Sequence, residues 1–296
     1  MSLIQEYLAD RKRESTERME ACRVIPSLTR EGLSYYPDIS YLRDGLKAHK
    51  MDMYCPRMKG PLPVIINVHG DPISGRKEAN RHFCMNLCKQ GYIVFSVNYQ
   101  LKPEASLRDQ IQDLADASAY IQNMSIELKM QSDNLFFVGD QGGAMLIYYL
   151  LAVQNDAALA RLLGIQPAPI SFCAAAYISG PIYQKDFRQR LASLVWEGRE
   201  KFRGYQFLKT DNPSLVDHQP PTLFFTSCRD DGYYGVMKLA AIFEEKERPV
   251  QVIRFDRSRD YYTGFCVNDP ELPESVRVLQ EITSFFREQR ANKTYE

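Results

Sequence analysis

The sequence has little of several features that would indicate a function directly. Its 296 residues include only four histidines and one tryptophan, and Lys plus Arg equals Asp plus Glu at 37 each. The positive charges are scattered along the chain, which gives no support for nucleic acid as a partner. No apolar run approaches the roughly 20 residues that a helix needs to span a bilayer. The composition therefore argues against nucleic-acid binding and against a membrane span.

Metal-binding and disulfide patterns are missing as well. The seven cysteines include no CxxC pair, and no HxxH or HExxH spacing occurs, so we expect no metal site and no cofactor. An odd number of cysteines without such spacing favours free thiols in a reducing compartment. The charged N-terminal stretch lacks the apolar region and cleavage site of a signal peptide, which favours a cytoplasmic protein. The sequence does not determine the oligomeric state.

Strand-like and helix-like segments alternate along the chain, without internal repeats or low-complexity stretches. This alternation predicts one α/β domain over residues 1–296, with a mostly parallel central sheet and helices on both faces. The apolar, β-branched runs predict strands at 62–70, 92–99, 134–140, 170–180, 221–230 and 250–256. The helical spacing of apolar residues predicts helices at 107–124, 144–154, 237–247 and 273–290.

The alternating pattern breaks between Pro181 and His218. This segment is aromatic and charged, and it holds Tyr183, Trp196 and Tyr205. In open α/β sheets, ligands bind at the carboxyl ends of the strands, where an insertion can cover them. We therefore expect a helical cap built from about residues 1–35 and 181–218.

The stretch NLFFVGDQGGAMLIYYLL begins at Asn134 and has the layout of a nucleophile elbow. A strand runs into Gly-Asp-Gln-Gly-Gly, and an apolar helix follows, so one side chain is raised at the apex of a sharp turn. The apex residue is Gln141. A carboxamide is not a nucleophile at neutral pH, whereas covalent acyl transfer needs an activatable oxygen, sulfur or nitrogen.

From about Tyr41 to the C-terminal helix, the sequence resembles the α/β-hydrolase fold. The resemblance is to esterases and lipases of the hormone-sensitive-lipase and acetyl-esterase type. It is carried by LPVIINVHGDPISG, NYQLKPE, VGDQGGAML, PPTLFFTSCRDD and RDYYTGF, which occur in the family's order. It implies a serine at the elbow, a histidine as general base, a carboxylate and an oxyanion hole.

The residues at these implied positions do not fit the chemistry. Gln141 stands in place of the serine and Thr263 in place of the histidine, whereas Asp230 keeps the acid position but has no histidine to orient.

The implied oxyanion loop is also altered. It begins with His69 and Gly70 and continues with Asp71 and Pro72, where the family has further glycines. Proline has no N–H to donate, and Asp71 adds negative charge where an oxyanion would develop. The Gly142 N–H is the donor that we expect to remain.

Together these changes predict an esterase-like homologue that has lost serine-hydrolase activity, a pseudoenzyme. We expect its pocket to bind a small apolar or acyl-like ligand, or its cap to bind a protein. The alternative is a carboxylic-ester hydrolase that acts on small acyl or acetyl esters through non-standard residues. The candidates for such residues are His69, Asp71, Asp140, His218, Asp230, Asp231 and Cys266.

Overall fold

The computed structural model describes residues 32–71, 74–102, 104–128, 130–168, 170–181, 212–255 and 262–293, together with Ala9 and Arg13. Most of the two segments expected to form a cap lies outside these residues, as do Pro72, Tyr183, Trp196 and Tyr205. The cap and the oxyanion-loop proline therefore remain predictions.

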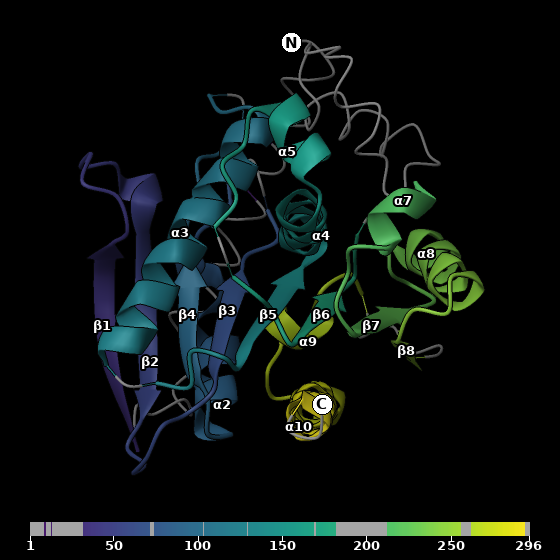
Figure 1. Ribbon diagram of the computed structural model, residues 1–296. Coiled ribbons are helices and arrows are strands. Elements are labelled where there is room, and N and C mark those ends of the chain that lie inside the picture. The colour runs from purple at the N-terminus through teal and green to yellow at the C-terminus, as the bar shows by residue number, and fades with distance from the viewer. Residues whose placement is uncertain are drawn as a thin grey trace.

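The described structure is built on an eight-stranded sheet with the strand order β1-β2-β4-β3-β5-β6-β7-β8 (Figure 1). β2 pairs antiparallel with β1 and β4, and the pairs from β4 through β3 to β8 are all parallel. The mostly parallel sheet that the sequence predicts is thus confirmed. The strands are β1 Leu33–Ser40, β2 Lys50–Pro56, β3 Val64–Val68, β4 Ile93–Val97, β5 Leu135–Asp140, β6 Ala174–Ile178, β7 Thr222–Ser227 and β8 Val250–Phe255.

Helices cover both faces of the sheet. Figure 1 shows α3, α4 and α8 on one side of it, and α2 and α10 on the other. Among the described residues, no helix is long and apolar enough to cross a membrane. The helices are η1 Lys47–His49, η2 Lys77–Asn80, α2 Arg81–Lys89, α3 Leu107–Glu127, α4 Gln141–Asn155, α5 Ala157–Leu163, α7 Pro213–Val216, α8 Tyr233–Glu245, α9 Phe265–Asn268 and α10 Pro273–Lys293.

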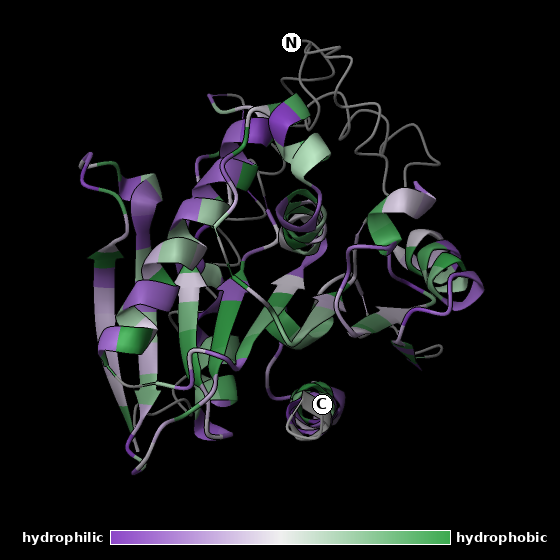
Figure 2. Cartoon of the chain, in the orientation of Figure 1, coloured by the Kyte–Doolittle hydropathy of each residue, from purple (hydrophilic) through white to green (hydrophobic). Residues whose placement is uncertain are grey.

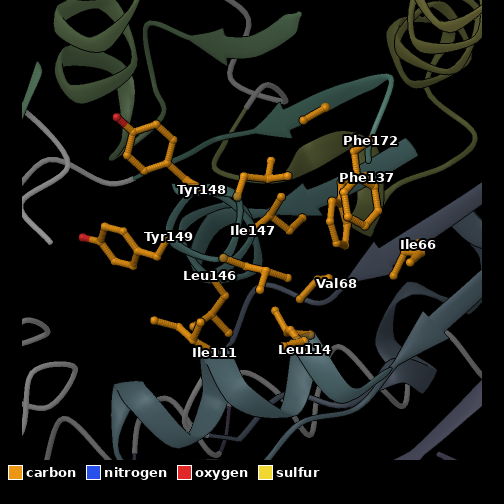
Figure 3. Close-up of a cluster of buried hydrophobic side chains, with 14 of the residues drawn as sticks. Ile66, Val68, Ile111, Leu114, Phe137, Leu146, Ile147, Tyr148, Tyr149 and Phe172 are labelled. Carbon is orange, nitrogen blue, oxygen red and sulfur yellow. The ribbon is translucent and has the colours of Figure 1, made fainter. Parts of the chain in front are cut away.

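The sheet separates two hydrophobic clusters because successive side chains of a strand point to opposite faces. In β3, Val64 and Ile66 join the cluster under α3 and α4, whereas Ile65 joins the one under α2 and α10. The central strands are therefore buried on both faces and mostly apolar, and Figure 2 shows them largely green. Figure 3 shows Leu146 and Ile147 of α4 meeting side chains of α3, β3 and β5.

α4 is the most deeply buried helix near the expected elbow. Twelve consecutive residues from Gly142 to Val153 are buried. A helix that is apolar on all sides belongs in the interior, where neighbouring elements fix its axis and its ends. Its N-terminus is therefore held rigidly at the carboxyl end of β5.

The structure adds elements that the sequence patterns did not predict. β1, at the sheet edge, begins at Leu33, inside the range expected to contribute to the cap. α5 follows α4 directly, and α4 itself begins at Gln141 rather than near residue 144. The carboxyl end of the sheet is thus formed as expected, but the helix starts at the elbow residue itself.

A buried ionic cluster joins the first two strands to the segment after β3. Lys77 is 2% exposed, and its Nζ lies 2.6 Å from Asp52 Oδ1, 2.8 Å from Glu78 Oε1 and 3.1 Å from Asp38 Oδ1. Asp52 is fully buried and also accepts the Tyr35 hydroxyl at 2.9 Å. These carboxylates hold the pKa of Lys77 above its usual range despite the opposing effect of burial.

Candidate functional site

The nucleophile position is a sharp turn between β5 and α4. Gln141 has a φ of 46°, a left-handed conformation that costs an L-residue about 1–2 kcal/mol. The turn also requires glycine at position 143, where a Cβ would lie 2.2 Å from the Val68 carbonyl oxygen. The chain therefore keeps the strained elbow geometry but raises a carboxamide at its apex.

Asp140, directly before the apex, supports the loop above it. Its side chain is 1% exposed, and Oδ1 accepts a hydrogen bond from Asn80 Nδ2 at 2.8 Å. A Cβ on Gly70 would lie 2.3 Å from Asp140 Oδ2, so the carboxylate packs directly on the Gly70 backbone. In the part of the chain that the structure describes, no group of three or more His, Cys, Asp or Glu residues could hold a metal ion. Asp140 thus packs beneath the loop, with Oδ1 bonded to Asn80 and Oδ2 against Gly70.

The acid position, Asp230, lies just past the end of β7 and faces inward. It is 7% exposed and accepts the Gly232 N–H at 2.8 Å and the Thr226 hydroxyl at 3.2 Å. The hydroxyls of Ser179 and Thr263 also donate to it. Burial raises the pKa of Asp230, and the four hydrogen bonds act in the opposite direction. This carboxylate is therefore enclosed by hydroxyl and amide donors.

Ser179 is a site residue that the sequence patterns did not single out. It follows β6 directly, is buried, and has a φ of 53°. Its Oγ accepts the Gly264 N–H at 2.8 Å and donates to Asp230. One serine thus links the ends of β6 and β7 to the segment before α9. A strand end followed by Gly-Pro was the only signal in the sequence.

Thr263 lies in the position that the resemblance assigns to the histidine. Its Oγ1 donates to Asp230 and accepts the Asp231 N–H at 3.0 Å. The next residue, Gly264, has a φ of 68°, and a Cβ there would lie 2.9 Å from Gln141 Nε2. The three triad positions, Gln141, Asp230 and Thr263, are therefore brought together.

Replacing Thr263 with valine is expected to destabilise the protein by about 1–2 kcal/mol, because it leaves Asp230 without one donor and the Asp231 N–H without its acceptor. Urea unfolding measures the change. Thr263→Ser is the matched control, since it keeps the hydroxyl, and it should retain most of the stability. A loss in Thr263→Ser as large as the loss in Thr263→Val would contradict the particular importance given to the hydroxyl.

The oxyanion position differs from the expectation. The Gly142 N–H, expected to be the remaining donor, instead donates to the Gly70 carbonyl oxygen at 2.9 Å. His69 stays inside the loop, where its ring stacks on Tyr99 with centroids 4.3 Å apart. The Tyr99 hydroxyl also donates to the His69 carbonyl oxygen at 2.9 Å. The N–H group that would bind an oxyanion is thus already hydrogen-bonded to a backbone carbonyl.

His218, the candidate for a relocated base, is far from the elbow. Its Nε2 lies 3.7 Å from Asp156 Oδ2, and its carbonyl oxygen accepts Asn155 Nδ2 at 3.0 Å. Asn155 ends the 15-residue helix α4, which begins at the elbow. At 1.5 Å per residue, the two ends of α4 are roughly 22 Å apart. His218 therefore does not serve the elbow.

The remaining histidines and Cys266 are enclosed in the fold. His49 is buried between Asp44 and Asp113, and its Nε2 lies 3.1 Å from Asp113 Oδ1. Burial lowers the pKa of His82, which lies in α2. Cys266 is 1% exposed in α9. None of these three groups is presented as an exposed nucleophile or base at the elbow.

Comparison with known proteins places the chain among esterase-like folds. The BD-FAE family model matches residues 51–170, which is less than half of the chain. A non-reducing polyketide synthase, ausA of Emericella nidulans, is 29% identical over 165 residues, or 53% of this chain. The chain spans only 6% of the length of that relative.

Solved structures match over nearly the whole chain. Esterase B from Lactobacillus Rhamnosis (HN001) superposes with a TM-score of 0.89 at 20% identity, covering 99% of this chain and 98% of that one. A bacterial heroin esterase superposes with a TM-score of 0.73 at 18% identity, covering 95% and 92%. The protein therefore has the α/β-hydrolase fold, and its similarity within that fold is to the esterase and lipase type.

Proposed function

We propose that this protein is a non-hydrolytic member of its fold that binds a small apolar or acyl-like ligand without cleaving it. The observation that carries the proposal is Gln141 at the apex of the elbow, in the strained conformation that exposes a nucleophile in an active enzyme. The carboxamide can donate and accept hydrogen bonds, but it cannot form an acyl intermediate.

The surroundings of Gln141 support the same proposal. The carboxylate that would orient a histidine is enclosed by the hydroxyls of Ser179, Thr226 and Thr263. The N–H of Gly142, which would stabilise an oxyanion, donates to a backbone carbonyl. The nucleophile and the base are therefore replaced, and the oxyanion donor is paired within the protein.

The proposed ligand class is supported by the similarity to Esterase B. One structure of that protein holds a C4-C4 SN3 tributyrin phosphonate, and this chain superposes on it over 98% of its length with a TM-score of 0.89.

We also propose a cytoplasmic location, supported by the six free cysteines among the described residues.

The experiment is hydrolysis of p-nitrophenyl acetate and butyrate by purified protein, beside Gln141→Ala and a protein-free blank. We expect both proteins to match the blank, and we expect tributyrin to raise the melting temperature while remaining intact. Turnover by the wild type that is lost on changing Asp71 or Asp230, but not Gln141, would support the alternative of a hydrolase with non-standard residues. Absence of any thermal shift would contradict the proposed ligand class.

A further inference from the structure

Asp71 begins a hydrogen-bonded turn directly after Gly70, whose carbonyl is paired with the Gly142 N–H at the oxyanion position. Asp71 Oδ1 accepts the Ser74 N–H at 3.2 Å, and Oδ2 accepts the Ser74 hydroxyl at 2.6 Å. The Asp71 carbonyl oxygen accepts the Gly75 N–H at 3.1 Å. A Cβ on Gly75 would lie 2.4 Å from that carbonyl oxygen, so the turn also needs glycine at its end.

This turn fixes the direction of the Gly70 carbonyl. The carbonyl belongs to the peptide unit between Gly70 and Asp71, and that unit rotates only if the Gly70 ψ and the Asp71 φ change together. Rotation at Asp71 would break the turn to Ser74 and Gly75. On the other side, Gly70 rests on the Asp140 carboxylate. The peptide unit is thus held from both ends.

We propose that the Asp71 turn is a brace that holds the Gly70 carbonyl against the Gly142 N–H and so keeps the oxyanion position closed to ligands. This inference rests on the proposed function and deepens it. The Gly142 N–H is already paired, so an anionic or carbonyl oxygen gains no hydrogen bond from it unless it displaces Gly70. The brace therefore favours neutral, apolar ligands over carboxylates.

The test is the hydrogen-exchange rate of the Gly142 amide, measured by NMR on the full chain. Asp71→Ala removes both side-chain acceptors, and we expect the Gly142 amide to exchange about tenfold faster or more. The amide of Ile93, which donates to the Pro63 carbonyl oxygen at 2.9 Å in the sheet, is the internal reference and should not change. An unchanged Gly142 rate beside an unchanged Ile93 rate would overturn the proposal.

Two milder variants keep the test decisive if Asp71→Ala fails to fold. Asp71→Asn keeps an acceptor for the Ser74 N–H and should preserve most of the Gly142 protection. Ser74→Ala removes the 2.6 Å hydroxyl contact but keeps the Ser74 N–H, and it should give an intermediate rate. We expect the Gly142 amide to be most protected in the wild type, less protected in Asp71→Asn and Ser74→Ala, and least protected in Asp71→Ala. Any other order would contradict the brace. Because exchange needs no substrate, this result stands apart from any finding of ester hydrolysis by the wild type.

Discussion

A variant that carries both Gln141→Ser and Thr263→His is expected to hydrolyse p-nitrophenyl butyrate about 10²–10³-fold faster than the wild-type chain. Each single variant should stay near the wild-type rate, because Gln141→Ser alone supplies a nucleophile without a base and Thr263→His alone supplies a base without a nucleophile. A stopped-flow burst of about one equivalent of p-nitrophenol would show that an acyl-enzyme forms.

The geometry supports this gain because the acid already lies beside the new base. The Thr263 hydroxyl donates to Asp230, so an imidazole at position 263 has the carboxylate next to it. A Cβ built on Gly264 would lie 2.9 Å from Gln141 Nε2, so the elbow side chain lies next to the segment that holds position 263. The rate should stay well below that of a complete enzyme, since each missing oxyanion donor costs about 10²–10³.

Two controls show whether the gain comes from the restored triad. Adding Asp230→Asn to the double variant should remove most of the gain, because the amide cannot stabilise the imidazolium. Gln141→Ala with Thr263→His should show no burst. Equal rates for this control and for the variant with Gln141→Ser and Thr263→His would mean that the histidine alone catalyses hydrolysis. The elbow would then not be the site of chemistry.

The largest expected loss of stability follows from Asp52→Ala, about 3–5 kcal/mol. Asp52 is fully buried, and its Oδ1 lies 2.6 Å from the Nζ of Lys77, itself 2% exposed. Among the described residues, removing the carboxylate leaves the Lys77 ammonium group inside the fold with two peripheral partners, Asp38 and Glu78. Urea unfolding, followed by circular dichroism, measures the change in the free energy of unfolding.

Glu78→Gln is the matched control for this prediction. Glu78 Oε1 lies 2.8 Å from the same Nζ, but its side chain is 35% exposed, so its contribution is screened by solvent. We expect a loss below about 1 kcal/mol. The double variant Asp52→Leu/Lys77→Met should recover much of the stability, because it removes both buried charges together. Similar losses for Asp52→Ala and Glu78→Gln would refute the central role given to Asp52.

The central strands could be predicted because their environment is uniform. β3 and β4 are buried on both faces, and such strands have continuous apolar, β-branched sequences. β1 gave no such pattern. Its sequence LSYYPDIS contains a proline, and Asp38 has a φ of 56° where the pairing register shifts between Tyr36 and Ile39. Both features are typical of an edge strand. Such a strand can be recognised only from its pairing with β2 in the folded structure.

The short helix α5 was missed although its end signals are present in the sequence. Asp156 caps its start by accepting the N–H groups of Ala158 and Leu159, and Gly164 ends it with a φ of 62°. Seven residues are too few to show a helical period, so length hid the element. A helix this short can be predicted only when the capping residue at its start and the glycine at its end are considered together.

The sequence by itself determined which chemical groups this protein carries at the elbow and beside it. Gln141, Thr263 and Asp71 follow from residue identity alone, and a carboxamide lacks a nucleophile in any fold. The tertiary structure alone decided how the remaining polar groups are paired. The Gly264 N–H meets the hydroxyl of Ser179, 85 residues away, and the Gly142 N–H meets the Gly70 carbonyl. Such contacts depend on the order in which strands lie side by side in the sheet, because buried donors must find acceptors among whichever segments the fold brings near.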